Sequence, residues 1–290
     1  QLGHMPTDEF VRKHNEFAEK MRSVDPSVNL VAVGNVGEWD EMILSHSAEN
    51  MDYISEHFYR QDWHGGGVIT HTRQVPDAIS HIAEAHRIYR DTIPELKGRD
   101  IRISMDEWNY WYGPHIYGEL GTRYFQKDAL GIAAGIHEYS RNSDIIYMAN
   151  YAQTVNVIGA IKTNDITSSF ATTGLVLKLY RDKFGKWPIK MDQTYRPLDV
   201  AATLTLNKDT LTLGVVNPTD QSWEVPLDLK NATPAGDATQ WIISGPDAEA
   251  YNEPGKEPNV TIKGPRKLNH AKSFSMPALS AAIVRIPLKK

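Results

Sequence analysis

The 290-residue sequence contains no cysteine, so it has no disulfide, no thiolate metal site and no cysteine nucleophile. It also lacks an excess of positive charge. Its 31 lysines and arginines stand against 36 aspartates and glutamates, a formal net charge of -5, which favours neither nucleic acid nor an anionic membrane surface as a partner. No apolar run approaches the roughly 20 residues of a membrane-spanning helix. The lack of cysteine does not fix the compartment, and a cytoplasmic and a secreted protein remain alternatives.

The N-terminus lacks both an initiator methionine and the basic and apolar regions of a signal peptide. The chain starts Gln1-Leu-Gly-His-Met5, and Thr7-Asp8-Glu9 then opens a predicted helix with acids in its first turn. We therefore expect the chain to begin inside a domain, as one piece of a longer polypeptide.

The first 188 residues alternate between predicted strands and predicted helices, which is typical of a parallel α/β sheet. The carboxyl ends of such strands share one end of the sheet, where sites of this fold class lie. Residues 63–71, with three consecutive glycines and His64 and His71, are predicted as a loop that has no phosphate-binding pattern. The strands are expected at 28–34, 51–59, 101–107 and 144–151, and the helices at 7–23, 38–47, 76–89, 124–139 and 169–184.

After Trp187-Pro188 the pattern changes to short alternating segments between proline, glycine and aspartate clusters. Residues 202–206 and 210–216 flank Asn207-Lys208-Asp209 as a predicted hairpin. Further strands are expected at 223–229, 238–243, 259–262 and 281–286. The sequence therefore predicts two domains, an α/β domain over residues 1–188 and a β-sandwich over residues 189–290.

One stretch stands out as a candidate site, Ile101 to Pro114. It begins as a β-branched strand and ends in Asp106-Glu107-Trp108-Asn109, followed by three more aromatic residues. Adjacent carboxylates are rarely buried without a partner. Carboxylates beside aromatic faces suit a sugar, whose ring stacks and whose hydroxyls form hydrogen bonds. The alternative is a strand end whose acids are only solvated or paired with cations.

Four segments resemble the α-L-arabinofuranosidases of glycoside hydrolase family 51, retaining enzymes built on a (β/α)8 TIM barrel and a β-sandwich. Met105-Asp-Glu-Trp-Asn-Tyr-Trp-Tyr112 resembles the nucleophile motif of that family. Asp52-Tyr-Ile-Ser-Glu-His-Phe-Tyr59 and Ala149-Asn-Tyr-Ala-Gln-Thr-Val-Asn-Val157 are similar to its sixth and eighth strands. Met276 to Ile286 is similar to the closing strand of its sandwich. The resemblance implies the C-terminal half of the barrel, strands five to eight, over residues 1–188, followed by a jelly-roll-like sandwich.

The resemblance also implies roles for individual residues. Glu107 would be the catalytic nucleophile, which forms a glycosyl-enzyme intermediate. His57 and Tyr59 would orient the substrate and the nucleophile, and Gln153 would bind a sugar hydroxyl. Trp108 and Asn109 are expected beside them as further substrate contacts. A satisfied strand-end histidine is the alternative for His57, and a strand-end cap is the alternative for Gln153.

The sequence departs from the family pattern at the general acid/base, a glutamate in a strand-end Gly-Asn-Glu. Gln1-Leu-Gly-His4 resembles the segment just downstream of that motif, but Asn15-Glu16 falls within a predicted helix and Asn252-Glu253 within the sandwich. Glu56 and Glu119 are the nearest alternatives, and neither fits. We expect the missing N-terminal half to carry this acid, and half a barrel also leaves sheet edges unpaired.

The predicted function is the release of terminal arabinofuranose from arabinan, arabinoxylan or their oligosaccharides, without cofactor or metal. His64 and His71 have no third ligand at a suitable spacing. This chain alone is expected to be inactive. An endo-glucanase or xylosidase of the same fold and a non-catalytic carbohydrate-binding fragment are the alternatives. A homo-oligomer is compatible with the resemblance.

Overall fold

The computed structural model describes residues 5–62, 65–116, 118, 121–191, 195–229, 232–269 and 272–289. These residues form two compact units. The first draws on residues 1–59, 78–108 and 142–152, and the second on residues 60–77, 109–141 and 153–290. Each unit combines segments that are distant in sequence. No helix within the described ranges is both long and apolar enough to cross a membrane.

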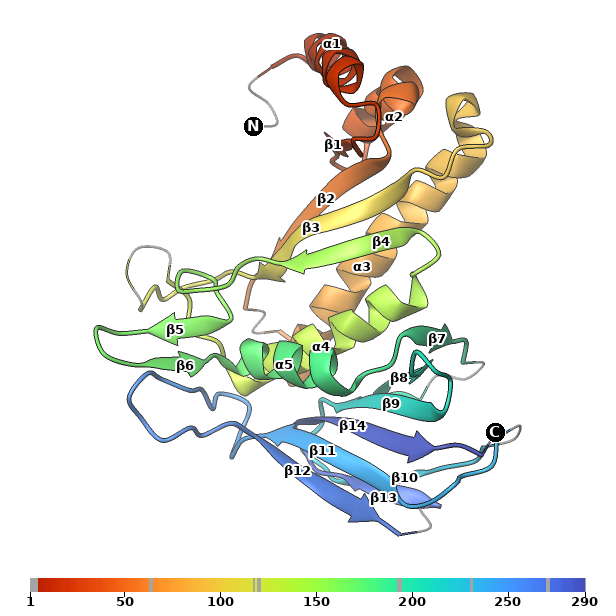
Figure 1. Cartoon of the computed structure of the whole chain (residues 1–290). Coiled ribbons are helices and arrows are strands. Elements are labelled where there is room, and N and C mark those ends of the chain that lie inside the picture. Colours follow the sequence, from red (N-terminus) through yellow and green to blue (C-terminus); the bar gives the residue numbers. More distant parts are fainter. Residues whose placement is uncertain are drawn as a thin grey trace. The chain divides into compact units, whose positions relative to one another are not determined.

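The first unit is built on a four-stranded sheet in the order β1-β2-β3-β4. Its strands are β1 (Val31–Val33), β2 (Tyr53–Arg60), β3 (Arg102–Tyr110) and β4 (Ile146–Tyr151). β1 pairs with β2 in parallel, and so does β3 with β4. Figure 1 shows β2, β3 and β4 running in the same direction. The predicted parallel sheet is therefore confirmed, and its strands end on the segments that carry the candidate site.

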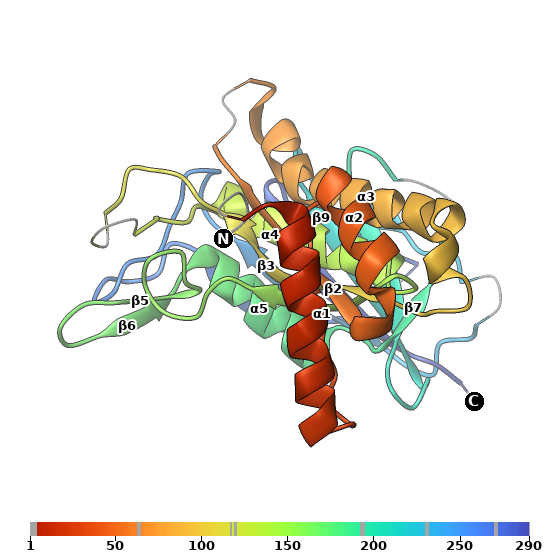
Figure 2. The ribbon, with the colours of Figure 1, turned by 90° about the horizontal axis from the view of Figure 1, so that it is seen from above.

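Three helices bury one side of this sheet. α1 (Thr7–Val24) lies beside α2 (Glu38–Ser47), as Figure 2 shows, and α3 (Gly67–Thr92) contributes its second half to the same unit. Two short 3-10 helices, Ala48–Asn50 and Pro94–Leu96, connect the helices to the strands. The core between helices and sheet is apolar and includes Ile43, Leu44, Ile54, Tyr89 and Ile93. Phe10 and Val11 of α1 pack against it, while Phe17 and Met21 on the predicted apolar face of the same helix stay exposed.

Two elements are longer than predicted. α3 begins at Gly67, so the predicted helix start at Pro76 is wrong and this proline lies inside the helix. The helix start was predicted at Pro76 because proline is favoured in the first turn of a helix. β3 continues to Tyr110, through the aromatic residues that were expected to follow the strand, because Trp108, Asn109 and Tyr110 are all buried.

The second unit contains the β-sandwich. A six-stranded sheet has the order β12-β11-β14-β9-β8-β7, and a two-stranded sheet pairs β10 with β13. Its core includes Val215, Phe274, Met276 and Val284. The bounds are β7 (Trp187–Ile189), β8 (Asp199–Leu204), β9 (Thr210–Asn217), β10 (Trp223–Pro226), β11 (Ala238–Ser244), β12 (Thr261–Leu268), β13 (Ser273–Met276) and β14 (Ser280–Pro287).

The predicted hairpin is confirmed as β8 and β9, which pair antiparallel. The sequence missed β13 and the small hairpin of β5 (Ile161–Thr163) and β6 (Ser168–Phe170). β6 occupies the start of the helix predicted from residue 169, and α5 (Thr172–Lys183) begins after it. Strands of three or four residues are too short to show the alternation of apolar and polar residues from which a strand is predicted. β7 pairs with β8, and the domain boundary after residue 188 stays a prediction.

α4 (Gln126–Arg141) is joined to the sandwich by a buried histidine. His137 Nδ1 lies 2.5 Å from Asp199 Oδ1, and its Nε2 lies 2.7 Å from the Tyr180 hydroxyl. Arg141 donates to the same aspartate oxygen at 2.6 Å. The carboxylate accepts the Nδ1 proton, and because burial disfavours the charged imidazolium, Nε2 of the neutral ring accepts the tyrosine proton.

This network predicts that acid weakens the fold. Burial lowers the pKa of His137. Below about pH 6.5 the His137 imidazole is therefore protonated in the unfolded chain but stays neutral in the folded protein. Stability from this group is present above that pH and is lost as the pH falls, by up to about 1.4 kcal/mol per pH unit. Denaturant unfolding between pH 7 and pH 5 should show a smaller loss for His137→Gln than for the wild type.

His46→Gln is the matched control, since His46 is exposed. It should keep the wild-type pH dependence. Equal slopes for the wild type and His137→Gln would mean that the buried histidine does not titrate on unfolding.

Candidate active site

The candidate site lies where β3 departs from regular pairing. Met105 pairs with Ala149 and Trp108 with Tyr151, so two residues of β3, Asp106 and Glu107, face a single residue of β4. This is a β-bulge, in which one extra residue changes the direction of neighbouring side chains. Along a regular strand, adjacent side chains point to opposite faces. The bulge instead allows both carboxylates to reach β2.

Both carboxylates contact residues of β2 that were predicted from the sequence. Tyr59 donates its hydroxyl proton to Glu107 Oε2 at 2.7 Å. His57 Nε2 lies 3.0 Å from Asp106 Oδ1, and His57 Nδ1 lies 3.8 Å from Glu107 Oε2. His57 Nε2 is also 3.3 Å from Ser55 Oγ. Because residues 55, 57 and 59 alternate along one strand, their side chains share one face.

The electrostatics of the Glu107–Tyr59 contact fix the direction of its proton. Burial, followed by the hydrogen bond to Glu107, raises the pKa of Tyr59 above its usual value. The phenol therefore stays protonated and remains a donor. The side chain of Glu107 is 48% exposed and that of His57 is 44% exposed. A ligand in solution can thus reach the carboxylate, while its Oε2 is held by the protein.

Trp108, the residue after Glu107, is buried. Its residue exposure is only 2%. Its ring meets Tyr151 edge-on with centroids 5.7 Å apart and lies 6.5 Å from Phe58. This geometry favours a packing role behind Glu107 over a stacking surface for sugar. Its assignment as a substrate contact stays a prediction.

Asn109 and Gln153 belong to the second compact unit. Asn109 is fully buried, and its Nδ2 donates to the Tyr124 hydroxyl and to the Ile158 carbonyl, each at 2.8 Å. Its amide therefore fixes the backbone around it. Gln153 is exposed, as a ligand-binding side chain would be. The roles of both residues toward substrate also stay predictions.

The other acids and histidines considered in the sequence do not contact Glu107 in the described structure. Glu56 is 2% exposed and accepts a hydrogen bond from His86 at 2.8 Å, and burial raises its pKa to about 8. It therefore faces away from solvent. His71 was predicted in a loop, and this is wrong. It is buried in α3, stacks on Tyr110 and contacts Asp128 at 2.8 Å. His64 and Glu119 lie outside the described residues.

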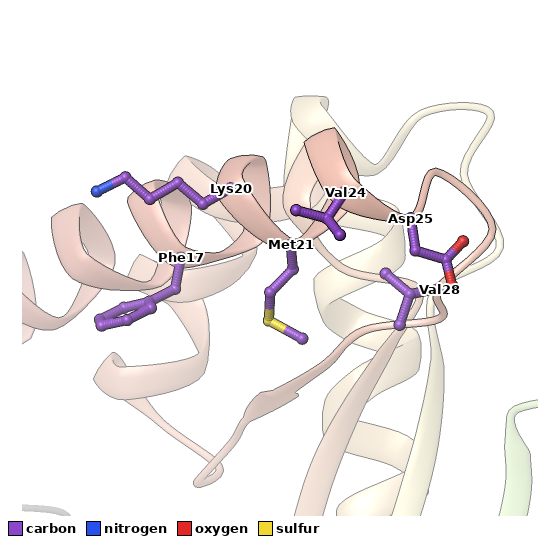
Figure 3. A pocket seen from close by; sticks show the side chains of 6 residues that line it. All are labelled: Phe17, Lys20, Met21, Val24, Asp25 and Val28. Atoms are coloured by element: carbon purple, nitrogen blue, oxygen red, sulfur yellow. The ribbon is translucent and has the colours of Figure 1, made fainter.

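A separate apolar groove lies along α1. It is lined by Phe17, Lys20, Met21, Val24, Asp25 and Val28, whose side chains Figure 3 shows. Three of these are exposed apolar side chains, and Val31 and Val33 on the adjoining edge strand β1 are exposed as well. The groove contains none of the residues around Glu107. It is a surface that a further polypeptide segment could cover.

Comparison with protein families identifies the family of this chain. Residues 106–280 match the family described as "Alpha-L-arabinofuranosidase C-terminal domain". The chain belongs to this arabinofuranosidase family. The matched segment begins at Asp106, the first carboxylate of the bulge, and extends to Ser280 at the start of β14.

Named relatives of the arabinofuranosidase family agree with this assignment. The chain is 26% identical over 290 residues to "Intracellular exo-alpha-(1->5)-L-arabinofuranosidase 1" of Bacillus subtilis, with 87% of this chain and 57% of that protein covered. It is 31% identical over 183 residues to the Streptomyces lividans enzyme of the corresponding name, with 56% and 28% covered. The chain thus spans little more than half the length of the Bacillus relative.

Solved structures of arabinofuranosidases share the fold. The arabinose complex of the Thermotoga maritima α-L-arabinofuranosidase superposes with a TM-score of 0.84 at 24% identity, covering 99% of this chain and 64% of that one. The GH51 enzyme of Thermotoga petrophila gives 0.83 at 24% identity, with 98% and 63% covered. The predicted fold class, half a TIM barrel followed by a β-sandwich, is confirmed.

Proposed function

We propose that this protein, in its complete form, is a retaining α-L-arabinofuranosidase with Glu107 as the nucleophile. The observation that carries the proposal is the accessible Glu107 carboxylate with one oxygen fixed by Tyr59. The membership of the arabinofuranosidase family supports the sugar. The substrates would be saccharides of the arabinan and arabinoxylan type, from which terminal arabinofuranosyl residues are released.

The two oxygens of Glu107 suit two different tasks. Oε2 accepts the Tyr59 proton and faces His57, whereas no described residue makes a hydrogen bond to Oε1. Oε1 would attack the anomeric carbon as the bond to the leaving oxygen breaks, and a covalent glycosyl ester would form. Water would then cleave the ester, returning the carboxylate and releasing arabinose with its configuration retained.

The leaving oxygen needs a proton from a second carboxyl group. In retaining enzymes the two carboxyls lie about 5–5.5 Å apart. Asp106 contacts His57, and Glu56 is buried behind the strand. Neither is a suitable donor to a bound sugar. We infer that the acid lies in a segment that this chain does not include, which agrees with the 57% coverage of the Bacillus relative.

That segment would also cover exposed apolar surface. β1 is an edge strand of the parallel sheet, with Val31 and Val33 exposed beside the α1 groove. An edge strand carries unpaired backbone groups that invite pairing with another strand. The missing half of the barrel would satisfy them. This reading explains why Phe17 and Val24 remain exposed at 65% and 87%.

The test compares this chain alone with the chain combined with the N-terminal segment of its own protein or a companion chain bearing Gly-Asn-Glu. The assay uses 4-nitrophenyl α-L-arabinofuranoside, with proton NMR of the first-formed sugar anomer. We expect hydrolysis with retention only for the combined protein. Hydrolysis by this chain alone would overturn the missing acid. A combined protein that hydrolyses only glucan or xylan substrates would overturn the assigned sugar.

A further inference from the structure

A second cluster of titratable side chains lies on the opposite face of β2 from His57 and Tyr59. Glu56 points there, because adjacent strand residues alternate, and it meets Asp40 of α2 and His86 of α3. His86 Nε2 lies 2.8 Å from Glu56 Oε1 and 3.3 Å from Asp40 Oδ2. One donor atom from each residue lies within 4.8 Å of the others. All three residues are at least 96% buried.

The charge of this cluster is incomplete. Two carboxylates face one imidazole, and among the described residues His86 is the only cationic group within ion-pair distance of either acid. Carboxylates taken out of water are costly unless their charge is compensated. A single imidazolium compensates one of them. A further positive charge, either a proton or a metal ion, must therefore reside in the cluster.

Asp40 is placed to take part with either of these charges. Its Oδ1 accepts a hydrogen bond from the Asn35 amide at 2.6 Å, which fixes the carboxylate. Its Oδ2 is buried and lies 3.3 Å from His86 Nε2, and a hydrogen bond between Asp40 and Glu56 contributes to the raised pKa of Glu56. The Nε2 proton of His86 already serves Glu56. Three ligand atoms held this close together, one of them on a carboxylate that is fixed through its other oxygen, form an arrangement that a metal ion can bridge once it displaces the shared proton.

We propose that Asp40, Glu56 and His86 form a structural binding site for a first-row divalent metal ion, with Zn²⁺ as the best fit. One imidazole and two carboxylates are common zinc ligands, and Zn²⁺ binds them at about 2.0–2.2 Å. Tetrahedral ligands at that length lie about 3.3 Å apart, which is the Asp40–His86 distance of 3.3 Å. The Glu56–His86 contact of 2.8 Å must widen. A water or the second Glu56 oxygen would complete the coordination.

The alternatives among biological cations fit less well. Ca²⁺ takes six to eight oxygen ligands and Mg²⁺ prefers an octahedral set of oxygens and waters, whereas this buried cluster supplies a nitrogen and two carboxylates. The metal would tie α2 and α3 to β2, the strand that also carries His57 and Tyr59. It would not touch the substrate, and the inference is independent of the proposed glycosidase function.

The test measures zinc binding directly. The purified protein is stripped with a chelator, and isothermal titration with ZnCl₂ is compared with MgCl₂ and CaCl₂, alongside elemental analysis of the zinc-loaded protein. We expect one zinc per chain and a thermal midpoint raised by roughly 5 °C or more at a hundredfold excess over Kd. Magnesium and calcium should leave the midpoint unchanged. Absence of stoichiometric zinc binding would overturn the proposal in favour of a shared proton.

Variants locate the ion. Asp40→Asn keeps the size of the side chain and should weaken zinc affinity at least tenfold. Mutation of residues that only hydrogen-bond to metal ligands already costs tenfold to a hundredfold in affinity, and Asp40 would be a ligand itself. Asp144→Asn is the matched control, because Asp144 is exposed and pairs with Arg87, the neighbour of His86. If Asp40→Asn fails to fold, Co²⁺ substitution in the wild type decides instead. A visible spectrum without tetrahedral d–d bands, or unchanged zinc affinity in Asp40→Asn, would overturn the site.

Discussion

Glu107→Gln should reduce arabinofuranoside hydrolysis by the completed enzyme by roughly 10³-fold or more, because an amide cannot form the glycosyl ester. The amide is isosteric and can still accept the Tyr59 proton, so the fold should be retained. The measurement is kcat and kcat/KM on 4-nitrophenyl α-L-arabinofuranoside, together with the thermal midpoint. The loss should appear in kcat, with the midpoint close to that of the wild type.

Glu84→Gln provides the matched control, since Glu84 is an exposed acid on α3. A nucleophile can also be separated from a positioning residue by chemical rescue. In Glu107→Ala, added azide should attack the sugar from the vacated side and give a glycosyl azide of inverted configuration. Activity in Glu107→Gln equal to that of Glu84→Gln would contradict the assignment. So would Glu107→Ala without any azide product.

Gly131→Ala should destabilise the protein by about 3 kcal/mol, although alanine is the better helix former by about 1 kcal/mol. Gly131 lies in α4, and an added methyl group would come 1.9 Å from the hydroxyl oxygen of Tyr110. That ring is fully buried, and its hydroxyl donates to the His71 carbonyl at 2.7 Å. The ring cannot retreat without losing this bond. The measurement is the free energy of unfolding in denaturant.

Gly236→Ala is the control, because a methyl group there meets no atom within 4 Å. Its effect should stay within about 0.5 kcal/mol. The opposing signs of the two contributions make the experiment decisive. A stabilised Gly131→Ala protein would mean that helix propensity prevails and that Tyr110 has room to move.

The sequence predicted most of the helices and strands that have a periodic pattern of apolar residues. α2 was placed at residues 38–47, where the structure has it, and the β8–β9 hairpin was found from its alternation and its polar turn. The meeting of His57, Tyr59 and Glu107 followed from the resemblance to a known family and is present as geometry. Their roles in catalysis stay predictions.

What the sequence could not predict depends on contacts between distant segments. Nothing local distinguishes His71 in a glycine-rich stretch from a loop histidine, because its burial is set by Tyr110 and Asp128. The burial of Trp108 could not be predicted either, since an aromatic residue beside carboxylates gives the same sequence pattern whether it is exposed or packed. Asp40, Glu56 and His86 are 16 to 46 residues apart, so no ligand spacing marks them in the sequence.

The extra residue of β3 determines whether this motif would keep its geometry in another protein. The octapeptide from Met105 to Tyr112 would not carry its chemistry into a strand of regular register, where Asp106 and Glu107 would diverge to opposite faces. Removing one residue from the bulge should therefore separate the two acids while leaving the composition of the strand almost unchanged. The placement of Glu107 is a property of chain length at this point. A one-residue deletion is consequently a more severe change here than most substitutions of the neighbouring side chains.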